Sequence, residues 1–153
     1  FYTFPIEWKS IKLDNVSINY INNQTFQNMS HLKLVILKSC KIKSIEDNSF
    51  SKLSLLNDLY LQMNELRRIN RLTMFGLTGL ITLNLNLNKI ELIEPDAFLS
   101  LNRLVTLHLE HNMLLTLDNT LNGLVRLRSF NFRHNLIKVF TNQTFNGLIN
   151  NVN

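Results

Sequence analysis

The chain has little of what usually shapes the corners of a compact domain, since its 153 residues include only 4 Gly and 2 Pro. An all-β or α/β domain of this length normally uses more of both at its turns, so another residue type must form the corners. The single cysteine, Cys40, excludes an internal disulfide scaffold and stands in no zinc-binding spacing. No apolar run approaches the roughly 18 residues that a membrane-spanning helix needs, so this segment is not expected to span a membrane.

Leucine and asparagine are the residues in excess, with 30 Leu and 23 Asn making up over a third of the chain. Hydrophobic residues at 45% and charged residues at 18% exclude an intrinsically disordered chain. An excess of two residue types, one apolar and one able to form turns, is typical of a repeated unit whose corners are made by asparagine.

A pattern of the form L-x-x-L-x-L-x-x-N-x-L recurs about every 24 residues through nearly the whole chain. Each copy is followed by a second apolar group that usually contains a phenylalanine, such as Phe98. All units span 24 residues except the fifth, which spans 23. The six units begin at Trp8, Leu32, Leu56, Leu80, Leu104 and Leu127. We therefore expect a repeat domain over residues 8–148, with an N-terminal flank or partial repeat at 1–7 and a C-terminal tail or truncated repeat at 149–153.

The spacing within one unit has a direct physical meaning. Leucines that alternate with polar residues predict a short strand with one buried face, and the asparagine after it predicts a corner where its side chain bonds unpaired backbone groups. Cys40 replaces this asparagine in the second unit, where we expect a small buried side chain with a weak donor. About seven inward side chains per unit, worth roughly 2 kcal/mol each, cannot offset the ordering of a whole unit at roughly 1 to 2 kcal/mol per residue. The units must therefore stack.

These motifs resemble the leucine-rich repeat family over roughly residues 8–148. The resemblance implies an α/β fold: a right-handed solenoid shaped as a horseshoe arc, with a parallel β-sheet on its concave face. The 24-residue unit with a phenylalanine in its second half resembles the extracellular class of these repeats, which Toll-like receptor ectodomains and insect leucine-rich-repeat immune proteins use. The resemblance therefore implies an extracellular glycoprotein, either secreted or the ectodomain of a membrane protein.

The two ends depart from that class. Such ectodomains commonly close their ends with cysteine-rich caps, and this chain has one cysteine. A solenoid with bare ends exposes its apolar core. We expect either a fragment of a longer ectodomain or a short protein that covers its ends by pairing.

No arrangement of residues in the sequence predicts catalysis. Serine, histidine and aspartate are present, but there is no glycine-rich elbow, phosphate loop, dinucleotide fingerprint or paired-carboxylate cleft. We expect no enzymatic activity, no cofactor and no bound metal. The balance of 16 basic to 11 acidic residues gives a net charge of +5, but the Lys and Arg residues are scattered and not interleaved with an aromatic platform. A nucleic-acid partner is therefore not expected.

Function in a solenoid of this kind is carried by side chains that point outward from the strands. Five apolar ones fall on neighbouring strands and would form an exposed patch with one tyrosine anchor, as in a protein-binding surface, although single exposed apolar residues are common. They are Leu34, Ile36, Tyr60, Met63 and Leu87. A polar group gathers at the other end of the same face: His108, Glu110, His111, Arg133 and His134. Neighbouring imidazoles near an arginine would give a contact that depends on pH in the endosomal range, and an ordinary solvated surface is the alternative.

Four N-x-[ST] sequences mark candidate glycosylation sites at Asn15, Asn23, Asn28 and Asn142. In a chain so rich in asparagine, chance alone would give about three, so their number is no sign of secretion. Asn23 and Asn142 begin the same Asn-Gln-Thr-Phe sequence on the expected convex side, where a glycan would leave the concave face free.

The predicted function is ligand recognition outside the cell, with a protein or a microbial surface component as the partner. The family resemblance favours a role in innate immunity. The alternative is an adhesion or assembly module that forms homo- or heterodimers through the apolar patch or the bare ends. An intracellular scaffold would suit the free cysteine, but the 24-residue class argues against it.

Overall fold

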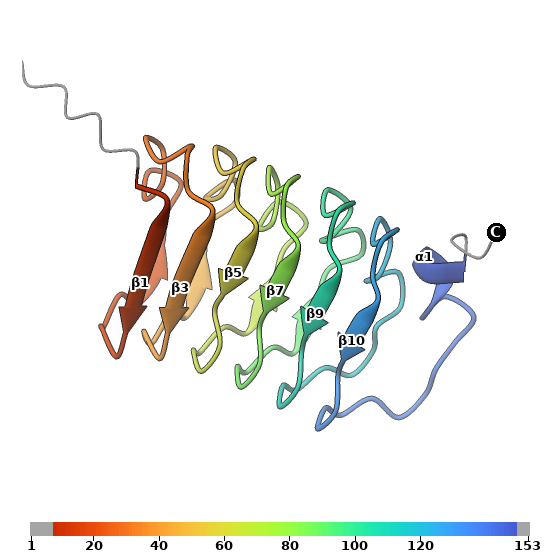
Figure 1. Cartoon of the computed structure of the whole chain (residues 1–153). Helices are drawn as coiled ribbons and strands as arrows, with labels where there is room; N and C mark the ends of the chain where they lie inside the picture. Colours follow the sequence, from red (N-terminus) through yellow and green to blue (C-terminus); the bar gives the residue numbers. More distant parts are fainter. Residues whose placement is uncertain (1–7, 150–153) are drawn as a thin grey trace, which may run out of the picture.

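The computed structural model describes residues 8–149, which form a solenoid of stacked coils (Figure 1). The predicted flank at 1–7 and most of the predicted tail lie outside the described residues. The elements are β1 (Ser10–Asp14), β2 (Tyr20–Ile21), β3 (Leu34–Lys38), β4 (Ser44–Ile45), β5 (Asp58–Tyr60), β6 (Arg68–Ile69), β7 (Thr82–Asn84), β8 (Leu92–Ile93), β9 (Thr106–His108), β10 (Ser129–Asn131) and α1 (Asn146–Ile149).

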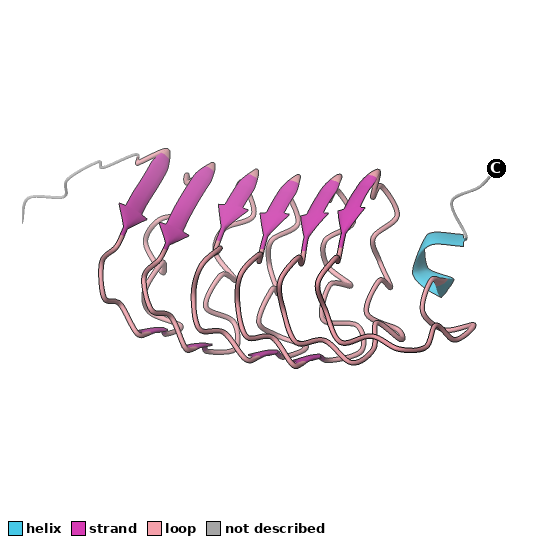
Figure 2. Cartoon of the chain, turned by 90° about the horizontal axis from the view of Figure 1, so that it is seen from below, coloured by secondary structure: helices cyan, strands magenta, loops and turns pink. Residues whose placement is uncertain are grey.

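Six strands, one from each predicted unit, form a parallel sheet in the order β1-β3-β5-β7-β9-β10. Each strand pairs in register with the strand one unit later, so that Leu59 lies between Val35 and Leu83. The 23-residue unit keeps this register, because Phe130 pairs with Leu107. The sheet lines one side of the solenoid, and the short strands of the pairs β2-β4 and β6-β8 lie on the opposite side (Figure 2). The predicted solenoid and its parallel sheet are confirmed.

The core is the stack of inward side chains that the repeat pattern predicts. Leucines at the same position of successive units, such as Leu59 and Leu83, are fully buried, and so are Phe50 and Phe98 at the back of the solenoid. Burial falls at the two ends of the stack. Phe130 on β10 is only partly buried, whereas its register partner Leu107 on β9 is fully buried. Each coil therefore depends on a neighbour to cover it.

An asparagine ladder closes the corners after β5, β7, β9 and β10. In one rung, Asn88 Nδ2 donates to the carbonyl oxygens of Leu61 and Leu85 at 2.9 and 3.0 Å, and its Oδ1 accepts the Leu66 N–H at 3.1 Å. The other rungs, which make the same three kinds of bond, are Asn64, Asn112 and Asn135. Each asparagine thus ties its own coil to the preceding one through backbone groups that have no strand partner.

Cys40 occupies a rung as predicted. Its Sγ lies 3.2 Å from the carbonyl oxygen of Lys38 and 3.6 Å from that of Leu13, in the place of the asparagine amide. A thiol lacks the amide oxygen, and here the N–H of Ile18 donates to the Cys40 carbonyl instead, at 3.0 Å. Burial raises the pKa of the Cys40 thiol above its ordinary value, which disfavours the reactive thiolate.

Asparagine also explains the scarcity of glycine. Four asparagines adopt the left-handed conformation with positive φ that glycine usually takes: Asn15, Asn19, Asn48 and Asn119. Glycine is kept where the coils approach too closely for a side chain. At Gly123, with φ of 84°, an added Cβ would lie 2.6 Å from the Leu99 carbonyl oxygen.

Replacing Asn88 by alanine should lower the free energy of unfolding by about 2 kcal/mol or more. The change leaves the buried Leu66 N–H unpaired, and the carbonyls of Leu61 and Leu85 each lose one of their two amide donors. Chemical denaturation followed by circular dichroism measures the effect. Asn102→Ala, at an exposed position, is the matched control, and equal stability of the two variants would contradict the ladder's role.

Asp118 should make stability depend on acid pH. It accepts hydrogen bonds from the hydroxyls of Thr144 and Thr141 at 2.6 and 2.8 Å, and these bonds hold its pKa below the ordinary value. Because the folded-state pKa is the lower one, the stabilisation is present at neutral pH and is lost as the pH falls through the folded-state pKa. Asp118→Asn should therefore melt earlier than the parent protein at pH 7, with the gap closing in acid. A gap that stays constant with pH would rule this out.

Candidate functional site

The outer side of the large sheet, here called the sheet face, presents side chains in rows that run across the coils. One row follows the strand register: Lys12, Ile36, Tyr60, Asn84, His108 and Asn131. Neighbouring strands of a sheet lie about 4.8 Å apart, so residues next to each other in a row are direct neighbours. A ligand on this face therefore meets the same position of several coils at once.

A second row, here called the left-handed row, lies just before the ladder position of each unit. Its members all have positive φ, between 53° and 58°: Asn15, Ser39, Met63, Leu87, His111 and His134. The N–H of each of the first five donates to a carbonyl oxygen of the following coil, as Leu87 does to Glu110 at 2.9 Å. This conformation costs an L-residue roughly 1 to 2 kcal/mol, and only the asparagine relieves part of that cost.

The predicted apolar residues form two groups on the sheet face. Leu34, Ile36 and Tyr60 are half-buried on β3 and β5, where Ile36 and Tyr60 are register partners. Met63 and Leu87 belong to the left-handed row, and each is 47% exposed. The two exposed side chains therefore stand on strained backbone, where neither core packing nor local conformation favours a large apolar residue.

The predicted histidines are brought together in part. His111 and His134 are consecutive members of the left-handed row, and their rings stack with centroids 4.2 Å apart and planes 12° from parallel. His108 lies on β9 and contacts Glu110 instead, at 3.3 Å between Nδ1 and Oε1. Within residues 8–149, no three His, Cys, Asp or Glu side chains gather as they would around a metal ion.

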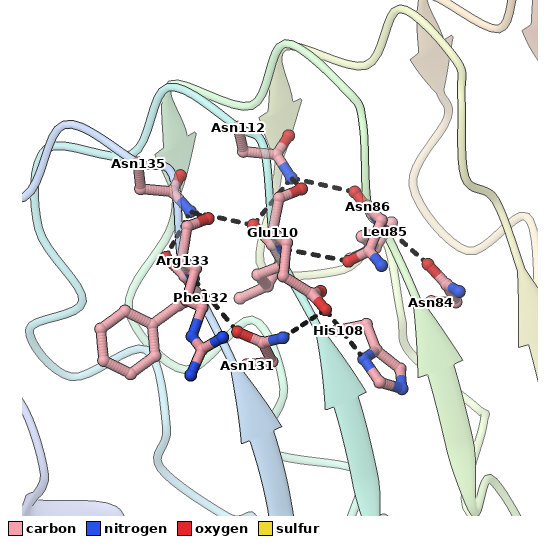
Figure 3. A network of polar contacts seen from close by, with 11 residues as sticks. Asn84, Leu85, Asn86, His108, Glu110, Asn112, Asn131, Phe132, Arg133 and Asn135 are labelled. Atoms are coloured by element: carbon pink, nitrogen blue, oxygen red, sulfur yellow. Dashed lines mark hydrogen bonds and ion pairs between the residues drawn. The ribbon is translucent and has the colours of Figure 1, made fainter.

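A polar network joins the end of β7 to the ends of β9 and β10 (Figure 3). At its centre, Glu110 Oε1 accepts a hydrogen bond from the Asn131 side-chain amide at 2.5 Å and contacts the His108 imidazole. The Glu110 N–H donates to Asn86 Oδ1 at 3.0 Å, so the same residue is held through its backbone as well. Glu110 Oε2 is buried and has no hydrogen-bond partner in the described part of the chain. This oxygen is therefore an unsatisfied acceptor inside the network and is not exposed to a ligand.

The three asparagines of this network were not among the predicted site residues. Asn84 and Asn131 each accept the N–H of the residue two positions later, at 3.0 and 3.3 Å, which is an Asx-type contact. The sequence carries a signal for that contact, because each asparagine is the last residue of its strand, and asparagine favours such contacts where the chain turns. The bond from Asn131 to Glu110 has no such signal, since it joins residues of different units.

Arg133 and the candidate glycosylation sites are all exposed. Asn15 is the first member of the left-handed row, so a glycan there would stand at one end of the sheet face. Asn23 and Asn142 lie in the turns at the back of the solenoid. The part of the chain that the structure describes contains no helix long and apolar enough to cross a bilayer.

Comparison with known proteins identifies the repeat. The sequence matches the family profile described as Leucine rich repeat over residues 8–66 and 56–114. No curated protein matches the chain in sequence.

Solved structures match the fold. A chain of the glycosylated Drosophila Toll–Spätzle complex superposes with a TM-score of 0.75 at 24% identity, over 82% of this chain and 18% of that one. A chain of the TLR13–ssRNA13 complex gives 0.63 at 27%, over 92% and 23%. A chain of the octameric latrophilin 3, Unc5D and FLRT2 complex gives 0.74 at 24%, over 86% and 41%. The chain thus spans less than half the length of each of these proteins.

Replacing Leu87 by asparagine should leave the protein as stable as before, or stabilise it by about 0.5 kcal/mol, because asparagine tolerates positive φ better than leucine. The same change at buried Leu85 should unfold the protein at a much lower denaturant concentration. Denaturation midpoints of both variants test the expectation. A clear loss of stability in the Leu87 variant would mean that its side chain holds the fold together.

Proposed function

Because the chain belongs to the leucine-rich repeat family, we propose that it is an extracellular recognition module that binds a protein ligand through its sheet face, with a role in innate immunity. The binding surface comprises the apolar groups of β3, β5 and the left-handed row together with the polar network around Glu110. The similar Toll–Spätzle complex is a molecular hub in Drosophila development and innate immunity, which supports the immune role.

The exposure of Met63 and Leu87 is the observation that carries this proposal. Both are large, apolar, 47% exposed and held at positive φ. Such residues contribute nothing to the core and carry a conformational cost, so contact with a partner is the role that suits them. Exposed polar side chains of the same face, such as Arg133, would give that contact specificity.

A protein suits this face better than a nucleic acid. One of the similar structures is a complex with single-stranded RNA, but the sheet face here carries three basic and three acidic residues and so offers no positive field. These residues are Lys12, Lys38, Arg133, Asp14, Asp58 and Glu110. Tyr60 is the one Phe, Tyr or Trp side chain of its strand row, and Asn84 separates it from the imidazole of His108, whereas successive bases stack on several neighbouring rings.

Substitution on the left-handed row should abolish ligand binding without unfolding the protein. We expect the double variant Met63→Asn and Leu87→Asn to bind at least about ten-fold more weakly, as loss of a central apolar anchor does. The probe is a display library of secreted proteins from the source organism, selected on the parent protein and then measured against each variant. Leu115→Asn, at a position 63% exposed and away from the sheet face, is the matched control.

Comparing the affinities of the double variant and the Leu115 control shows which surface binds the ligand. If the selected ligands bind the double variant as tightly as the parent protein but bind the Leu115 variant more weakly, another surface binds them and the proposal is wrong. Ligands that lose affinity only with the double variant support it.

Self-assembly is the second candidate function, favoured by the apolar surface near the C-terminal end of the described stack. Leu136, Val139 and Phe140 are each more than half exposed there. A module that pairs through this end would sediment as a dimer at micromolar concentration, and Phe140→Ser would return it to a monomer. A monomeric parent protein would exclude this function.

A further inference from the structure

The charges of the chain are distributed unevenly among its surfaces. In each unit the chain runs from a buried residue at the back of the solenoid, such as Phe50 or Phe98, to the next strand of the large sheet. We call the side of the solenoid along which it runs the ascending flank. It consists of residues 8–9, 27–33, 51–57, 75–81, 99–105 and 122–128. The opposite side, on which the chain leaves the ladder and returns to the back, is the descending flank. It consists of residues 41–49, 65–73, 89–97, 113–120 and 136–144.

The ascending flank carries six of the sixteen Lys and Arg residues and no acidic residue. Its cations are Lys9, Lys33, Lys52, Arg103, Arg126 and Arg128, all of them exposed. The descending flank carries seven basic and seven acidic residues, and the sheet face carries three basic and three acidic residues. Both of those surfaces are therefore neutral, and the whole net positive charge of the described residues lies on the ascending flank.

The cations of the two flanks also differ in their partners. On the descending flank, Arg67 pairs with Glu91 at 2.9 Å and Lys89 with Glu65 at 3.0 Å, each across neighbouring coils. None of the six cations of the ascending flank forms an ion pair within residues 8–149. Their charge is not used in holding the coils together, so it is available to a partner.

Three of these cations cluster on the last two coils beside a groove. Arg103 and Arg126 hold the same position of consecutive units, and Arg128 follows two residues later. A depression of about 570 Å³ lies here, lined by Val105, Val125, Arg126, Leu127 and Arg128. Its base is firm, because the N–H groups of Arg128 and Ser129 both donate to the Val105 carbonyl, at 2.9 and 3.0 Å. The groove thus combines two guanidinium groups with aliphatic walls.

We propose that the ascending flank binds an acidic protein segment whose aliphatic side chains enter this groove. Guanidinium groups recognise carboxylates with paired hydrogen bonds, and the unopposed positive field draws in an anionic partner. The aliphatic walls distinguish the partner. A sulfated polysaccharide has no apolar group for Val125, which is 47% exposed, and segments 99–105 and 122–128 hold no aromatic ring on which a nucleic-acid base could stack.

This surface is separate from the sheet face, so the two proposals can fail independently. A ligand of the sheet face meets a neutral surface and should be little affected by salt. An acidic ligand of the ascending flank should bind more weakly as salt is added, because its attraction is screened.

The test uses three probes of defined chemistry on the whole chain: a twelve-residue peptide of alternating Glu and Leu, a polyglutamate peptide of the same length and a heparin octasaccharide. We expect the Glu-Leu peptide to bind at least about five-fold more tightly than polyglutamate, because only it can fill the aliphatic walls. The triple variant Arg103→Gln, Arg126→Gln and Arg128→Gln should lose at least about ten-fold in affinity for both peptides. Fluorescence anisotropy at two salt concentrations measures both effects.

Two controls keep the result specific. Lys43→Gln, Arg68→Gln and Lys138→Gln remove the same charge from exposed positions of the descending flank and should leave affinity within about two-fold. Val125→Ser should abolish the preference for the Glu-Leu peptide while polyglutamate still binds. Equal losses in the two triple variants, tighter binding of heparin than of the Glu-Leu peptide, or no binding of any probe would each overturn the proposal.

Discussion

The structure depends on one repeated interaction, the hydrogen bonding of buried backbone at the corner after each strand. The coil must turn there inside the apolar stack, where N–H and C=O groups cannot reach water. In four of the six units one asparagine amide meets this need, and it does so by bonding two coils at once. The same bonds that make the corner possible therefore join successive coils. At Cys40 the two functions of the amide are divided, since the thiol replaces the donor and the Cys40 backbone carbonyl replaces the acceptor.

Stacking at a constant spacing turns every position of the unit into a row, and this determines where binding residues can lie. The corner places the residue before each ladder position at positive φ, also before Val16 and Cys40, so the left-handed row is a consequence of the corner itself. Its occupants are then free of the core and can vary: asparagine and serine at one end, Met63 and Leu87 in the middle, two histidines at the other. A row of this kind has a fixed backbone and changeable side chains, which is a favourable arrangement for recognition.

The period of the leucines was sufficient to predict the strands, the core, the ladder and the role of Cys40, because each follows from which residues must be buried. The positive φ of Met63 and Leu87 was not predictable in the same way, since leucine and methionine disfavour that conformation and only the neighbouring coils impose it. The bond between Asn131 and Glu110 also escaped prediction, because it depends on side-chain conformations across two strands. The order of residues within one unit predicts which side chains are buried, but it does not predict contacts between outward side chains of different units.

The distribution of charge, like the lateral contacts, is seen only in the folded structure and not in the sequence. Along the chain the Lys and Arg residues look scattered, and the net charge of +5 looks like a mild general bias. In the folded solenoid, the position of a charged residue within its repeat unit decides on which surface it lies. The sheet face and the descending flank are therefore neutral, and the ascending flank is cationic. A neutral face with exposed apolar residues selects partners by shape and hydrogen bonding, whereas an unopposed cationic flank attracts them over a Debye length of about 10 Å at moderate salt. The sheet face and the ascending flank therefore differ in net charge, and the side chains of both project from coils that the ladder holds together.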